Sequence, residues 1–273
     1  MQYIRYGYVP TPTPVQPPKT PADTFKRLLS SGWFLFAIIC TVAILILQVV
    51  QAFALSSVFT DMLDALKEAG MPITAAEMKV LKAIGKVYDQ YIFTVLLAAL
   101  TPYIFTFIGY LWLYIGAKSG KEKTLARGAT VFQVMNMIPF VVFVLYLVLL
   151  IVAMLFLIIV FFAMKDFLVI AEAILLLLMF FLILLVLMFY SGFAKMWKGL
   201  KKTVLTGENC CKVSSYVVFW YWAGIVLGII GALASIAVGI VSAIAAALEV
   251  FCMIVIIGVF TKFKDEEGLP QKK

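Results

Sequence analysis

The chain has 273 residues, of which 64% are hydrophobic and only 13% are charged. Soluble domains are about 45–50% apolar and about 25% charged, so a water-soluble globular protein is excluded. In a soluble protein the formal net charge of +8 would favour nucleic acid as a partner, but in a chain this apolar the positive-inside rule of membrane proteins explains it better. We therefore predict an all-α, polytopic membrane protein that does not bind nucleic acid.

The N-terminal tail, residues 1–23, is polar and rich in proline, as in the stretch PTPTPVQPP at residues 10–18. Proline at this density favours extended polyproline II structure and cannot build a core, so a disordered tail is predicted. The alternative is a docking site for a proline-reading domain, although the spacing matches PxxP only loosely. A single transmembrane domain is predicted to follow, over residues 24–263.

Six segments of this domain are apolar enough to cross a bilayer, whose hydrocarbon layer of about 30 Å takes roughly 20 helical residues. The predicted spans cover residues 33–56, 91–117, 138–163, 167–194, 215–235 and 239–261. The polar pair Lys165-Asp166 divides one long apolar stretch into two spans, and small residues at 234–239 divide another. Asn136 and Pro139 are predicted to break the helix before the third span.

Between the first two spans, residues 57–90 are predicted to form a helical hairpin outside the membrane. Apolar residues recur at helical spacing as far as Gly70-Met71-Pro72, where the helix should end, and Thr74-Ala75-Ala76-Glu77 fits a capping box that starts the next helix. The tip at residues 70–73 would then lie about 20 Å above the bilayer. Two short helices lying flat on the lipid surface are the alternative.

The basic residues indicate the orientation of the chain. With six spans, 17 of the 22 lysines and arginines fall on the side that holds both termini. This bias predicts that both termini, including the tail 264–273, are cytoplasmic, and the expected location is the plasma (cytoplasmic) membrane. Five spans, with the last basic segment outside, are the alternative.

Four polar side chains lie inside the predicted spans, namely Glu249, Glu172, Gln48 and Gln51. Helix rise counted from the outer turns places all four in the outer half of the membrane, where they could form one outward-open site for a cation or a proton. The alternative is that they are packing groups that hydrogen-bond across helices. Pro102, in the middle of the second span, is a candidate hinge.

Gly224 and Gly228 form a GxxxG motif, which is continued by the small residues Ser235 and Gly239. Small residues at this spacing let helix backbones approach closely. Helix packing within one molecule is the main interpretation, and a homodimer is the alternative.

Catalytic and metal-binding motifs are missing from the sequence. The chain has no histidine, and its four cysteines include no CxxC pair. Histidine-dependent catalytic systems are therefore excluded, and a zinc site with the usual ligand sets has no support. We predict no catalytic residue, metal site or cofactor, and no motif is specific enough to indicate a family.

Two functional classes remain open. The first is a non-enzymatic interaction or accessory membrane protein, which contacts the lipid bilayer and presents the hairpin 57–90 to a protein partner. The alternative is a small transporter or channel that uses Glu249 and Glu172 for a cation or a proton.

Overall fold

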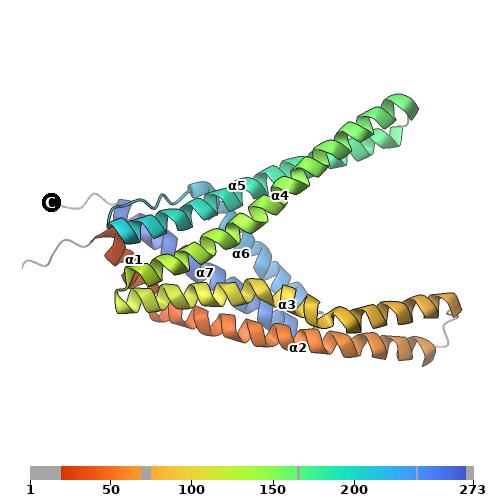
Figure 1. The fold of residues 1–273 in the computed structure, drawn as a ribbon, viewed down its shortest axis with the longest axis horizontal. Coiled ribbons are helices and arrows are strands. Elements are labelled where there is room, and N and C mark those ends of the chain that lie inside the picture. The colour runs from red at the N-terminus through yellow and green to blue at the C-terminus, as the bar shows by residue number, and fades with distance from the viewer. Residues whose placement is uncertain (1–19, 69–74, 165–166, 238, 269–273) are drawn as a thin grey trace, which may run out of the picture.

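The computed structural model describes residues 20–68, 75–164, 167–237 and 239–268, and within these ranges it contains seven helices and no strand (Figure 1). The helices are α1 (Pro21–Leu29), α2 (Gly32–Glu68), α3 (Ala75–Ser119), α4 (Glu122–Met164), α5 (Phe167–Thr206), α6 (Ser215–Ser235) and α7 (Ile240–Gly268). Six of them, α2 to α7, are long and apolar enough to cross a membrane. The prediction of an all-α fold with six candidate spans is therefore confirmed.

Much of the surface of α4 and α5 is apolar. Large side chains such as Leu149 and Ile159 of α4 and Leu178 of α5 are exposed, and they belong to a run of exposed apolar residues that covers most of both helices. A contiguous apolar surface of this extent is rare on soluble monomers. In a helix every backbone polar group inside the segment is paired, as the interior of a bilayer requires. This surface therefore fits a multi-pass membrane protein.

Helix α4 passes through Asn136 and Pro139 without interruption, so the predicted break is wrong. Proline removes one backbone donor, but unwinding the helix would expose several more unpaired groups, which is costly in an apolar environment. The Asn136 side chain also stays within the helix, because its Nδ2 donates to the Phe132 carbonyl at 2.7 Å. In the last apolar block, α6 ends at Ser235 and α7 begins at Ile240, on either side of the small residues where the sequence predicts a turn.

Helices α2 and α3 run side by side (Figure 1). Neither is interrupted where the predicted spans end, at residues 56 and 91, so each continues as one helix from its apolar part into its polar part. The predicted tip at 70–73 and the capping residue Thr74 lie outside the described residues.

The helices meet at one end of the molecule, at the left of Figure 1, which we call the base. The base consists of α1, the starts of α2, α4 and α6, the ends of α3, α5 and α7, and the loop 207–214. Trp197 of α5 is fully buried at its centre, stacked on Phe132 with ring centroids 4.5 Å apart and edge-on to Phe260 at 5.0 Å. A continuous chain of ring contacts links all seven helices through Phe25, Phe34, Tyr110, Phe132, Phe193, Trp197, Tyr221 and Phe260.

Helix α1 is attached to this base by both apolar and polar contacts. Phe25 stacks on Phe263 of α7 at 3.7 Å, and both rings are buried. At the surface, Lys26 pairs with Glu122 at 3.2 Å and Arg27 pairs with Glu266. Exposed ion pairs are worth at most about 1 kcal/mol, so the buried rings supply most of the stability and the pairs mainly fix the position of α1.

The start of α1 carries its own capping box. Thr20 and Asp23 cap each other reciprocally, and the hydrogen bonds from Thr20 lower the pKa of the Asp23 carboxyl. Asp23 therefore stays ionised at neutral pH, where its charge also favours the N-terminus of the helix.

Away from the base the helices separate into pairs. The α4–α5 pair diverges from the α2–α3 pair toward the right of Figure 1, and α6 and α7 lie between them in this view. The ring contacts between α5 and α7, from Phe193 and Trp197 to Phe260, lie at the base. The contacts that fix how the helix pairs are arranged therefore lie mainly at the base.

We expect Trp197→Ala to lower the free energy of unfolding by about 3–5 kcal/mol, because it removes the ring on which the base converges and leaves a cavity. The measurement is chemical or thermal denaturation of the purified protein in detergent. Trp222→Ala, at a side chain that is 45% exposed, is the matched control and should change stability little. Equal losses from the two substitutions would contradict a central role for the base.

Candidate functional site

Helices α2 and α7 pack antiparallel to each other, since α2 leaves the base and α7 returns to it. On both helices, residues that are not exposed recur at a heptad-like spacing of alternating three- and four-residue steps, which is the pattern of coiled-coil seams. On α2 the positions are Ala37, Thr41, Ile44, Gln48 and Gln51, and on α7 they are Ser242, Ala245, Glu249, Cys252, Ile256, Val259 and Phe263. All of these side chains are buried or half-buried. The polar members therefore lie on the packed stripes of both helices.

Three polar pairs connect α7 to its neighbours along this contact. The Tyr103 hydroxyl of α3 donates to Glu249 Oε1 at 2.7 Å. Gln51 Nε2 of α2 donates to Ser242 Oγ at 2.9 Å. Nearer the base, Thr41 Oγ1 of α2 lies 3.8 Å from Cys252 Sγ. We call these six residues the polar seam.

The pairs occupy different levels of the bundle. Thr41 and Gln51 lie about 14 and 29 Å along α2 from Gly32, at 1.5 Å of rise per residue. Glu249 is about 20 Å along α7 from Lys262, which places its pair between the other two. The seam is therefore a ladder of separate hydrogen bonds and not a single cluster.

The structure places the sequence-predicted polar residues in two different parts of the molecule. Gln51 and Glu249 belong to the polar seam, and Gln48 is half-buried on the same stripe of α2. Glu172 is exposed on α5. It lies about 32 Å along α5 from Phe193, which contacts α7 at the base. Glu172 thus lies apart from the other three.

Gln48, Gln51 and Glu249 do not line the groove between α6 and α7, the groove between α3 and α4, or the groove beside α1. Among the described residues there is also no group of three histidine, cysteine, aspartate or glutamate side chains that could hold a metal ion. What the seam does chemically is to join three helices by hydrogen bonds that lipid cannot supply.

Pro102 precedes Tyr103 in the middle of α3. Its side chain is exposed, and α3 continues across it as one helix. Thr106 Oγ1 donates to the Pro102 carbonyl at 2.8 Å. The residue that the sequence marks as a candidate hinge is thus adjacent to the tyrosine that holds Glu249.

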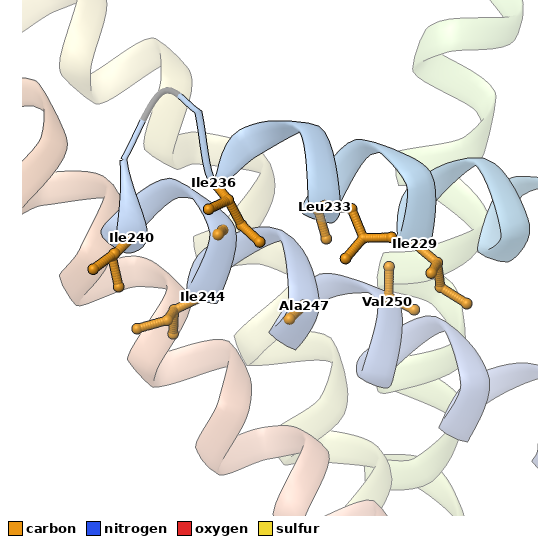
Figure 2. Close-up of a pocket in the computed structure, with 9 residues that line it drawn as sticks. Ile229, Leu233, Ile236, Ile240, Ile244, Ala247 and Val250 are labelled. Carbon is orange, nitrogen blue, oxygen red and sulfur yellow. The ribbon is translucent and has the colours of Figure 1, made fainter.

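An apolar groove of about 550 Å³ lies between α6 and α7 near the turn that joins them (Figure 2). Ile229 and Leu233 of α6, and Ile236 directly after it, line the groove from one side. Residues of α7, including Ile244 and Val250, line it from the other. Its lining contains no charged or polar side chain.

The glycines of the GxxxG motif lie against α7. A Cβ atom at Gly228 would meet Val250 Cγ2 at 2.7 Å, and one at Gly224 would meet Met253 Cε at 3.3 Å. Ser235 ends α6 and its Oγ donates to the Gly231 carbonyl at 2.8 Å. Gly239 lies in the turn, with open space where a Cβ would be. Close approach through Gly224 and Gly228 is therefore made within the molecule.

The loop 207–214 carries the adjacent cysteines. The Cys211 thiol is buried and lies 3.5 Å from the Met196 carbonyl, to which it donates. Burial, with a smaller contribution from Cys210, raises the pKa of the Cys211 thiol to about 12. Cys211 therefore stays protonated at neutral pH and is a poor nucleophile.

Four residues of the polar seam were not predicted from the sequence: Thr41, Tyr103, Ser242 and Cys252. Heptad spacing was a usable signal for three of them, because Ser242 and Cys252 lie seven residues before and three after Glu249, and Thr41 lies ten before Gln51. Tyr103 has no such signal, because its role depends on where α3 meets α7.

No protein family matches the sequence, and no curated protein or solved structure matches the chain.

If the Tyr103–Glu249 contact stabilises the bundle, Tyr103→Phe should lower the free energy of unfolding by about 0.5–2 kcal/mol. In a Glu249→Ala background the same substitution should cost little, because the acceptor is already gone. Tyr146→Phe, at an exposed tyrosine of α4, is the control and should be neutral. The measurement is a double-mutant cycle in mixed detergent, and fully additive losses would argue against the contact.

Proposed function

We propose that the protein is a non-enzymatic interaction or accessory membrane protein that presents the polar end of the α2–α3 pair to a protein partner. The observation that carries this proposal is the length and continuity of the two helices. They have 37 and 45 residues, which correspond to about 56 and 68 Å, whereas a bilayer's hydrocarbon layer is about 30 Å thick. Roughly 20 Å or more of each helix is thus in excess of what a crossing requires.

The composition of the excess segment supports the same proposal. Residues 57–90 contain nine charged side chains, four lysines and five acids, whereas residues 33–56 contain none. On α3, Lys79, Val80 and Ala83 are exposed, and Val80 is 59% exposed. In our proposal this segment is a hairpin outside the membrane and these residues belong to its contact surface.

The proposed orientation places the base and both termini in the cytoplasm of a plasma (cytoplasmic) membrane, because 17 of the 22 basic residues then lie on the cytoplasmic side. The hairpin is then on the outer side. The packing of Gly224 and Gly228 against α7 favours a glycine motif used within one molecule over one used in a homodimer.

We expect a photo-reactive residue at Val80 to form a defined protein adduct in intact cells, and one at Leu145, an exposed residue of α4, to form none. Replacing residues 58–88 by a short flexible linker should remove the partner identified in that adduct from the purified protein. The base lies at the opposite end, so the shortened chain should still elute as a folded species in size-exclusion chromatography. Full retention of that partner by the shortened chain would refute this role of the hairpin.

A second candidate function is a small cation or proton transporter, and one observation favours it. Glu249 is half-buried within a candidate span, and its hydrogen-bond donor Tyr103 directly follows Pro102, which removes one backbone donor from α3. Ionisable groups at such depth often mark ion or proton pathways. In this alternative Glu249 binds the ion or takes up the proton, and bending at Pro102 exposes it.

For the transporter alternative, Glu249→Gln should abolish cation or proton flux into proteoliposomes, because glutamine can neither carry charge nor take up a proton. Its amide oxygen can still accept from Tyr103, so folding should be retained. Glu172→Gln is the control, since Glu172 lies away from the seam, and should leave the flux unchanged. Unchanged flux in Glu249→Gln, or none in the parent protein, would remove this alternative.

A further inference from the structure

A third groove lies at the base, beside α1, between the start of α2 and the last turns of α7. It has a volume of about 490 Å³. Its lining differs from that of the α6–α7 groove because it includes two cations, Arg27 of α1 and Lys262 of α7, together with the hydroxyl of Ser31. The rest of the lining is largely apolar and includes Trp33 and Phe251.

The polar and apolar parts of this groove are separated along its length. Phe251 and Lys262 both line it and are eleven residues apart on α7, or about 17 Å. The Trp33 ring, which is 70% exposed, lies near the Phe251 ring with centroids 6.2 Å apart. Cations therefore stand at the base end, and an aromatic wall leads from there toward the middle of the candidate spans.

We propose that this groove binds an anionic phospholipid, with the phosphate held at Arg27 and Lys262 and one acyl chain lying along Phe251 and Gly258. A ligand that fits must be anionic at one end and apolar over the next 15 Å or so, which is the geometry of a lipid next to a transmembrane helix. A free phosphate would use only the polar end.

The polar end of the groove has enough hydrogen-bond donors to bind a phosphate. Arg27 pairs with Glu266, but a guanidinium has five N–H donors and can bind a second anion on its other edge. Ser31 Oγ accepts from the Phe34 amide at 3.3 Å, so the first turn of the 37-residue helix α2 begins beside the cations. The first N–H groups of a helix have no partner within it and favour anions, which adds to the attraction of the two side chains.

This groove differs from the other two in the number of cations in its lining. The α6–α7 groove has no cation in its lining. The groove between α3 and α4, of about 470 Å³, combines Arg127 with Trp112 and apolar residues, and so carries a single cation. The groove beside α1 is thus the one of the three with two cations above an apolar wall, and Arg127 provides a matched control.

The test measures binding of dioleoylphosphatidylglycerol to the purified full-length protein in detergent, by native mass spectrometry and by thermal shift, with dioleoylphosphatidylcholine as the neutral reference. We expect selective retention of phosphatidylglycerol and a higher melting temperature with it. Lys262→Gln should weaken this binding about fivefold, the contribution of one cation near a lipid surface. Arg127→Gln should leave it unchanged.

A second variant tests the apolar part without touching the charges. A Cβ at Gly258 meets nothing within 4 Å, so Gly258→Leu fills the groove and leaves the packed core intact. It should weaken phosphatidylglycerol binding while the melting temperature without lipid is kept or raised, because leucine is a better helix former than glycine. Gly231→Leu, at an equally open position on α6, is the control and should not affect binding.

Three results would overturn the proposal. Unchanged phosphatidylglycerol binding in both Lys262→Gln and Gly258→Leu would show that the lipid binds elsewhere. An equal loss from Arg127→Gln and Lys262→Gln would show diffuse attraction to the basic surface. Displacement of the lipid by millimolar glycerol phosphate, with the same stabilisation of the protein, would show that the site recognises a free phosphate.

Discussion

Aromatic packing at the base is the constraint on which the other contacts depend. Apolar helices in lipid gain little from contact with each other through the hydrophobic effect, because the lipid tails are equally apolar. Their arrangement must be fixed by contacts that lipid does not offer, and the largest set here is the chain of rings centred on Trp197. Since this chain includes a residue from each of the seven helices, it defines which helices are neighbours at the base. The polar seam and the α6–α7 glycine contact add direct contacts from α7 to α2, α3 and α6, which this chain of rings does not itself make.

The positions of these contacts explain why the helices meet at one end of the molecule and separate at the other. Beyond the base, α4 and α5 pack mainly on each other and expose the rest of their surface, whereas α7 is held by the seam to α2 and α3 and by Gly228 to α6. Each of these contacts uses a feature that a lipid tail lacks, either a hydrogen-bonding group or a glycine that lets backbones approach. Where the α4–α5 pair diverges, its described residues are mostly apolar and make no such contact with the other helices.

The sequence was sufficient for properties that depend on local composition. Apolar length alone predicted helices and six candidate spans, and the structure contains both. The break at Pro139 was wrong because the rule that proline ends a helix is derived largely from water, where solvent can satisfy the freed carbonyl. The hydrogen-bond partners of Gln51 and Glu249 could not be predicted from the nearby sequence. Ser242 reaches Gln51, and Tyr103 reaches Glu249, only because α2, α3 and α7 pack together. Heptad spacing identifies the stripe that faces a neighbour, but not which neighbour it faces.

The sequence argument grouped the two glutamates by their depth along a helix. Depth is only one coordinate, and it does not say on which face of the helix, or in which part of the bundle, a residue lies. Glu249 is about 20 Å from Lys262 at the base end of its helix, whereas Glu172 is about 32 Å along α5 from the base residue Phe193. In a bilayer whose hydrocarbon layer of about 30 Å begins at the level of the base, an upright α5 would bring Glu172 to the opposite interface and leave Glu249 inside. A carboxyl group inside needs a donor from the protein, and one at the interface can be hydrated. In the structure Glu249 is half-buried beside the Tyr103 hydroxyl and Glu172 is exposed, which agrees with such a placement.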